Sequence, residues 1–154
     1  MPEFQTRYFE QITYLPESVI EFPLGLPGFE NELRFLLIEQ ELNKPIVFLQ
    51  SLSRPDLCFI TVPVQGILPG YELTLTVEEL HTLELAEDRQ PVVGGDVIHL
   101  AVVSLAEDRP PTANLLAPIV ISWRKRLAVQ SVQTDSSYSH QHPLLARDLE
   151  PQCS

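Results

Sequence analysis

Few residues in this sequence have the types and spacing that chemistry needs. His140 and His142 are two positions apart, so on a strand both imidazoles would point to one face. A metal ion held there would take further ligands from His81, His99 or a distant carboxylate. Histidine pairs near a chain end are more often solvated side chains than ligands. We therefore predict no metal site and no cofactor.

Nucleophilic catalysis finds equally little support. Of the two cysteines, Cys58 stands in the apolar run 57–62, where burial would disfavour the thiolate, and Cys153 stands near the chain end. Two free thiols are the simpler interpretation, and a disulfide is the alternative. The sequence has no Gly-x-Ser-x-Gly, phosphate-loop, Gly-x-Gly-x-x-Gly, Cys-x-x-Cys or His-Glu-x-x-His motif. We predict a protein that is not an enzyme. A hydrolase built on scattered carboxylates stays as an alternative.

One cluster of cations, Arg124-Lys125-Arg126, follows Trp123 and could in principle stack on a base or bind phosphate. It could equally be a solvated hairpin end that protects an edge strand. The whole chain carries 21 acidic and 10 basic residues, a net charge of −11, which disfavours direct nucleic-acid binding. Such a surface favours basic protein partners, although charge can also serve solubility alone.

The elements that must position these residues are short. Fourteen prolines recur along the 154 residues, which argues against long helices and for strands joined by turns. No stretch approaches the roughly 18 apolar residues of a membrane span, and the first residues lack a signal-peptide pattern. We expect a cytoplasmic protein, a single domain over residues 1–154, and a core from about 11 to 145. The first residues and the polar tail beyond Leu145 are expected to be mobile.

Period-two alternation and short β-branched runs predict most of the strands. Residues 11–22 are expected to form a hairpin or one bent strand, and residues 97–105 a central strand buried on both faces. The segments 86–95 and 108–112, with Pro110 and Pro111 in the second, are expected to be loops. The further predicted strands are 35–38, 45–49, 57–62, 71–75, and the hairpin 119–121 and 127–129.

A single helix is expected near residues 77–85. Thr76 and Glu79 form a capping box, in which the threonine oxygen accepts an amide hydrogen bond and the glutamate reaches back to the cap. Leu80 and Leu83 follow at helical spacing. Strands this numerous and short favour an all-β, mainly antiparallel fold, either a compact barrel or a sandwich.

The run Ile20–Glu30 is the least regular part of the sequence. Two prolines and two glycines stand among large apolar residues, so it can be neither a helix nor a central strand. Its Phe22, Leu26 and Phe29 are too apolar for an ordinary solvated loop. They either plug the end of a barrel or contact a partner, and the sequence leaves both readings open.

Four turn-rich apolar segments stand in a characteristic order along the chain. They are Phe22–Glu30, Phe48–Leu52 with Pro55 and Phe59 after it, Asn114–Ile121, and Gln130 leading to Tyr138 and His142–Leu144. In this order and spacing the chain resembles the flagellar assembly factor FliW family from about Gln11 to Leu145. The bulky Trp123 and Leu127-Ala128 depart from the family pattern, so the hairpin tip is assigned no role, and none is assigned to His140 or His142.

The resemblance implies a binding protein of barrel-like fold. Members of the family bind newly made flagellin, through its C-terminal segment, and the RNA-binding translational regulator CsrA. They thereby couple the flagellin level to flagellin translation. A small-ligand-binding β-barrel is the alternative. A monomer is expected, although the sequence does not fix the oligomeric state. The residues expected to serve partner binding are Leu26, Phe29, Glu30, Asn31, Glu32, Gln50, Asn114 and Leu115.

Overall fold

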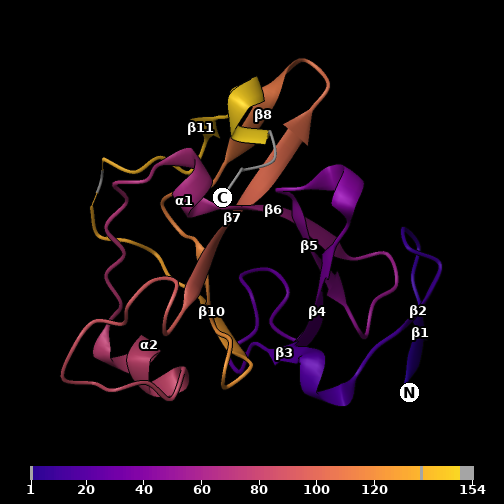
Figure 1. Cartoon of the computed structure of the whole chain (residues 1–154), viewed down its shortest axis with the longest axis horizontal. Helices are drawn as coiled ribbons and strands as arrows, with labels where there is room; N and C mark the ends of the chain where they lie inside the picture. Colours follow the sequence, from indigo (N-terminus) through magenta and orange to yellow (C-terminus); the bar gives the residue numbers. More distant parts are fainter. Residues whose placement is uncertain (1, 136, 150–154) are drawn as a thin grey trace.

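The computed structural model of the protein describes residues 2–135 and 137–149, and within these residues seven strands close into a barrel (Figure 1). The barrel order is β7-β6-β5-β4-β3-β10-β9, and β9 pairs back onto β7. All pairs are antiparallel except β3 with β10. The all-β prediction is therefore confirmed. The strands are β1 (Glu3–Gln5), β2 (Gln11–Thr13), β3 (Val19–Glu21), β4 (Arg34–Glu39), β5 (Val47–Ser51), β6 (Cys58–Pro63), β7 (Ile98–Ala106), β8 (Arg109–Ala113), β9 (Ile119–Ser122), β10 (Leu127–Gln130) and β11 (His142–Pro143).

Large apolar side chains fill the barrel interior, because alternate residues of each strand point inward. Phe22 and Phe35 are fully buried there and meet edge to face, with ring centroids 5.2 Å apart. Residues from five further strands join Phe35 of β4 and Phe22 in one buried cluster, together with the loop residue Leu26. The remaining members are Ile20, Val47, Leu49, Leu100, Ile119, Ile121 and Ala128.

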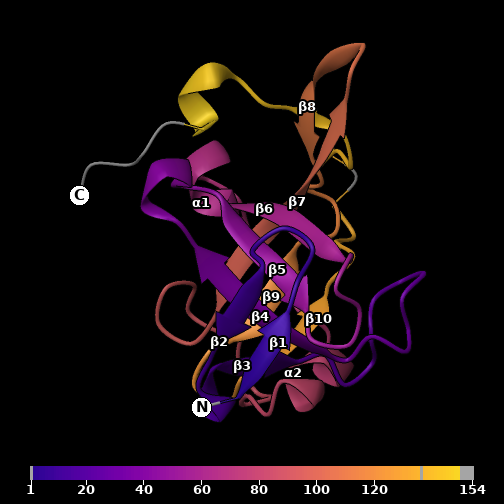
Figure 2. The same cartoon turned by 90° about the vertical axis from the view of Figure 1, so that its right-hand side faces the viewer.

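The N-terminal segment forms a second layer outside the barrel. β1 and β2 pair with each other as a hairpin that lies outside the barrel (Figure 2). Its Phe4 and Ile12 pack against a small buried cluster of Val19, Leu36 and Leu52. The expectation of a hairpin or bent strand over residues 11–22 was wrong. The 3₁₀ turn η1 (Pro16–Ser18) ends this outer layer, and β3 then pairs with β4 in the barrel wall.

The helices are short, and none in the described part of the chain is long and apolar enough to cross a membrane. α2 (Val77–Thr82) has the predicted capping box: Glu79 N–H donates to Thr76 Oγ1 at 3.1 Å, and Thr76 N–H to Glu79 Oε1 at 2.9 Å. Sequence patterns did not predict α1 (Val64–Ile67) or the 3₁₀ turn η2 (Glu41–Asn43).

The strand expected at residues 71–75 is absent from this described segment. Its backbone is satisfied by side chains instead of a neighbouring strand. Thr74 N–H donates to Gln133 Oε1 at 2.9 Å, and Leu75 N–H donates to Gln90 Oε1 at 2.8 Å. An alternating apolar pattern therefore marks burial here, as at Leu75, without a strand ladder.

The loop expected at residues 108–112 is a strand. β8 pairs with the second half of β7, and the two project beyond the barrel as an arm (Figure 2). Pro110 and Pro111 are tolerated because the ladder shifts register at this point, between Ser104 and Ala106. β7 is consequently not buried throughout: its first half lines the core, whereas residues 104–106 are exposed.

Residues 142–149 fold back on the arm. β11 pairs with β8, and the 3₁₀ turn η3 (Ala146–Leu149) follows. Asp148 is buried and its Oδ2 accepts the N–H of Leu145 at 2.8 Å. Residues 146–149 of the tail that was expected to be mobile thus form a turn with a buried side chain, and the residues after them lie outside the described part.

Candidate binding groove

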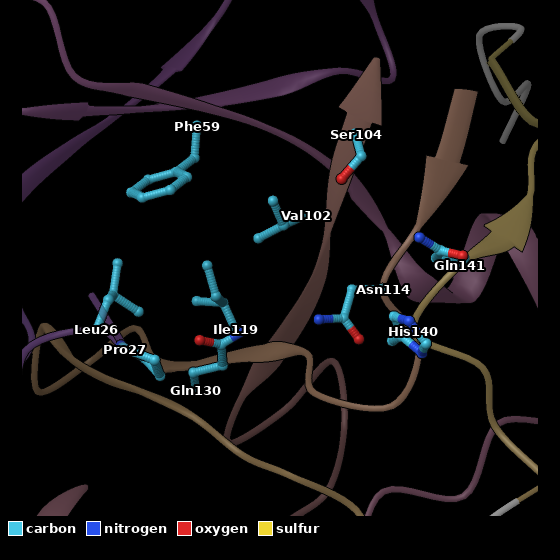
Figure 3. A pocket seen from close by; sticks show the side chains of 10 residues that line it. All are labelled: Leu26, Pro27, Phe59, Val102, Ser104, Asn114, Ile119, Gln130, His140 and Gln141. Carbon is cyan, nitrogen blue, oxygen red and sulfur yellow. The ribbon is translucent and has the colours of Figure 1, made fainter. Parts of the chain in front are cut away.

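A groove of about 340 Å³ opens in the barrel wall where β7 leaves β6. Figure 3 shows Leu26 and Phe59 toward one end of it and Asn114, His140 and Gln141 toward the other. Val102 and Ile119 lie between these ends. The lining thus joins an apolar half, made by the barrel, to a half of amide and imidazole side chains. Among the residues that the structure describes, no Asp, Glu, Lys or Arg lines it.

The groove gathers segments that are far apart in the sequence. Leu26 and Pro27 come from the loop between β3 and β4, and Phe59 comes from β6. Asn114 follows β8, and Gln130 ends β10. Each of the four segments that carry the family resemblance contributes lining residues. The structure adds Val102 and Ser104 of β7, which sequence reasoning missed; the change from apolar to small polar residues after Val103 was the available signal.

The β3–β4 loop owes its shape to glycine. Gly25 has φ +68°, and a Cβ at that position would lie 2.6 Å from the Cα of Glu30. The tight turn is closed by Phe29 N–H, which donates to the carbonyl of Leu26 at 2.7 Å. Because only glycine allows this approach, the loop folds back and drives Leu26, 4% exposed, into the barrel core.

Phe29 lies at the border between core and surface. It is half-buried, its ring meets Phe59 edge to face at 5.5 Å, and the Arg54 guanidinium lies 5.8 Å above it. The two interpretations of the run Ile20–Glu30, a barrel plug and a partner contact, therefore apply to different residues. Phe22 and Leu26 plug the barrel, and Phe29 retains a face toward solvent.

The polar residues of the same loop lie on the surface. Glu30 and Asn31 are exposed, and Glu30 Oε1 accepts the N–H of Gly28 at 3.3 Å. Glu32 is half-buried and accepts the hydroxyls of Ser51, at 3.2 Å, and of Ser53. These contacts tie the loop to the turn after β5.

Gln50 and Leu115 are buried, with 0% and 1% exposure, so neither side chain can touch a partner in this structure. Gln50 Nε2 donates to the carbonyls of Ser51, Arg54 and Pro55 at 3.0, 3.3 and 3.3 Å. Its Oε1 is buried with no hydrogen-bond partner in the described part of the chain. Gln50 thus shapes the turn between β5 and β6.

Asn114 organises the turn between β8 and β9. Its Oδ1 accepts the N–H groups of Leu116 and Ala117 at 3.1 and 3.0 Å, and Gln130 Nε2 donates to the Ala117 carbonyl at 3.0 Å. Both backbone groups of Leu115 are hydrogen-bonded. Its N–H donates to the carbonyl of Ser139 at 2.9 Å, and its carbonyl accepts the Tyr71 hydroxyl at 2.5 Å. One wall of the groove is therefore a rigid turn.

The residues considered for catalysis are dispersed. Within residues 2–135 and 137–149, no three His, Cys, Asp or Glu side chains are grouped so that they could hold a metal ion. His140 borders the groove, while His142 lies in β11. Burial raises the pKa of the Cys58 thiol to about 11, and Cys153 lies outside the described residues.

The basic tip closes the turn between β9 and β10. Trp123 Nε1 donates to the Gly95 carbonyl at 3.3 Å, and the Arg124 guanidinium lies 5.5 Å from the centre of the Trp123 ring. The tip is thereby tied to the loop before β7. In the described part of the chain, the residues that line the groove include none of this tip.

These features define a small, mainly antiparallel β-barrel protein with an open, uncharged groove in its wall. The chain belongs to the FliW protein family, which it matches over residues 3–144. It is similar to the flagellar assembly factor FliW of Bacillus subtilis, 33% identical over 140 residues that cover 90% of this chain and 94% of that protein. The FliW of Desulfitobacterium hafniense strain Y51 is 33% identical over 144 residues, covering 94% and 91%.

The fold agrees with the family. A crystal structure of the flagellar assembly factor FliW superposes with a TM-score of 0.80 at 31% identity, covering 94% of this chain and 97% of that one. The relatives bear the name of an assembly factor and not of an enzyme. The expected resemblance to the FliW family is confirmed.

Proposed function

We propose that this protein binds flagellin through the C-terminal segment of flagellin and antagonises the RNA-binding regulator CsrA in the cytoplasm. Free protein sequesters CsrA and relieves repression of flagellin synthesis. Surplus flagellin occupies the protein and restores repression. Flagellin level and flagellin translation are thereby coupled without catalysis. Membership in a family of flagellar assembly factors supports the flagellar part of this proposal.

The main support for the proposal is that all four turn-rich segments named in the sequence analysis contribute residues to the lining of one groove. Amide and apolar side chains line it, which suits a polypeptide ligand, because peptide groups need hydrogen-bond partners and apolar side chains need a dry surface. The packed barrel interior favours binding at this outer groove over a small ligand held inside the barrel.

The charge supports the second partner. An RNA-binding regulator carries basic surface, and a chain with a net charge of −11 attracts it over a distance of about 10 Å at 0.1 M salt. Phe29, Glu30, Asn31, Glu32 and Asn114 are exposed or half-buried and supply the contacts in this proposal. The buried residues Leu26, Gln50 and Leu115 act by shaping the loops that present them.

Titration calorimetry with CsrA, repeated after saturation with the C-terminal segment of flagellin, tests the proposal. We expect CsrA binding that weakens as salt rises and that weakens by about tenfold or more once flagellin is bound. Additive binding without coupling would refute the switch. Absence of binding to either partner would refute the whole function.

A charge reversal tests the position of the binding face. Glu30→Lys is expected to weaken CsrA binding about fivefold, because an exposed ion pair contributes up to about 1 kcal/mol. Asp88→Lys changes the charge equally on the exposed loop after α2 and serves as the matched control. Equal effects of the two substitutions would place the face elsewhere.

A further inference from the structure

Two strand edges diverge beside the groove without a partner. β6 and β7 pair from Thr61 with Val102 to Pro63 with Leu100, and the pairing then stops. Continued in the same register, Ile60 would lie opposite Val103. Instead β7 rises into the arm with β8 while β6 stays in the barrel wall (Figure 2). No strand of the described chain pairs with either of these two edges.

The backbone groups on these edges are directed toward the gap. Val102 accepts the N–H of Asn114 at 2.9 Å, on the β8 side. Since successive residues of a strand point their N–H and C=O groups to opposite edges, Val103 presents both groups on the open edge. On β6 the Leu57 carbonyl accepts from Ser51 on the β5 side at 3.0 Å, so Ile60 faces the gap likewise.

We propose that an extended segment of a partner protein adds to the open edge of β7 as an antiparallel strand. Its backbone pairs with Val103, and the side chain next to that pair enters the groove between Phe59 and Val102. The inference rests on the proposed function and deepens it, because the added strand is a segment of flagellin.

The chemistry of the groove restricts the inserted segment. A cavity of about 340 Å³ with uncharged lining takes a large apolar side chain. Glu30 and Glu107 are exposed on the segments that adjoin the groove, so acidic residues in the inserted segment would be repelled. The segment is therefore apolar at its inward positions and neutral or basic beside them.

The decisive variant is Val103→Pro. Proline removes the N–H on the open edge and leaves the β8 ladder intact, since Val103 does not point its backbone toward β8. Val103→Ala loses the same packing but keeps the N–H, so it is the matched control. With purified full-length flagellin as the probe, we expect Val103→Pro to bind at least about tenfold more weakly than Val103→Ala.

Amide hydrogen exchange of the wild-type complex tests the same pairing without a variant. Flagellin is expected to slow exchange at Val103, and unchanged exchange there, or equal binding by the two variants, would overturn strand addition while flagellin binding itself survives. Protection of Val103 in the free protein together with a dimer in sedimentation would assign the edge to a second copy and overturn the proposal. Wild-type protein that binds no flagellin would overturn it together with the proposed function.

Discussion

Substitution of Gly25 by alanine is expected to destabilise the protein by about 3 kcal/mol. An alanine at φ +68° costs about 1–2 kcal/mol, because its Cβ crowds the following carbonyl. The new Cβ would also lie 2.6 Å from both the Cα and the carbonyl oxygen of Glu30. Backbone cannot rotate away like a side chain, so the loop must shift, and such overpacking costs a further 1–3 kcal/mol or so.

Two other glycines separate these contributions. Gly28 has φ +83°, but a Cβ added there would meet no atom within 4 Å, so Gly28→Ala should show the conformational cost alone, about 1 kcal/mol. Gly70 has no positive φ, and a Cβ added there would meet no atom within 4 Å, so Gly70→Ala should change stability by less than about 0.5 kcal/mol.

Urea denaturation of the three variants, followed by tryptophan fluorescence and circular dichroism, gives these free energies of unfolding. The expected order of destabilisation is Gly25→Ala, then Gly28→Ala, then Gly70→Ala. If Gly25→Ala and Gly28→Ala were equally destabilising, the close approach to Glu30 would contribute nothing to the loss of stability in Gly25→Ala. The account of how the loop drives Leu26 into the core would then be wrong.

Two further predictions concern stability. Burial lowers the pKa of His99 below its usual 6.5, so the unfolded chain gains a proton before the folded protein does. The free energy of unfolding should therefore fall by up to about 1.4 kcal/mol per pH unit as the pH drops below 6.5, until the folded pKa is reached, in urea titrations between pH 7.5 and 5.5; His99→Gln should lack this component. Thr76→Ala should cost about 1 kcal/mol through loss of the α2 cap, whereas Thr76→Ser should restore most of it.

Much of the barrel was predictable because its strands obey local rules. The runs at 35–38 and 57–62 alternate or are β-branched, and each lies within a strand or overlaps one almost completely. The capping box predicted the start of α2 at the correct residue. These signals depend on neighbours in the sequence, which is why they survive without knowledge of the fold.

The errors arose where distant residues decide the structure. Residues 71–75 alternate like a strand, yet Gln90 and Gln133 supply the hydrogen bonds that a neighbouring strand would give. Pro110 and Pro111 suggested a loop, yet a register shift in the partner strand accommodates them. Neither the glutamine contacts nor the register shift can be predicted from the neighbouring residues in the sequence.

The groove was half predictable for a related reason. Leu26 and Asn114 belong to turns with a distinctive composition, and the structure brings both to the lining. Val102 and Ser104 belong to an ordinary-looking strand. They line a groove only because β7 pairs with β6 as far as Val102 and then departs with β8. The divergence of two strands is a property of the whole sheet, so the sequence of a single strand does not predict it.

Two amides in the segments on which the resemblance was based show what such a sequence pattern indicates. Gln50 donates to three carbonyls of one turn, and Asn114 accepts two N–H groups of another. A buried backbone group left without a partner costs about 1–3 kcal/mol, so each amide fixes its turn more strongly than a surface contact would. A sequence pattern that includes these residues therefore identifies the shape of the loops. In the function proposed above, the partner contacts the features next to these turns, namely Phe29, Glu30 and the open edge of β7.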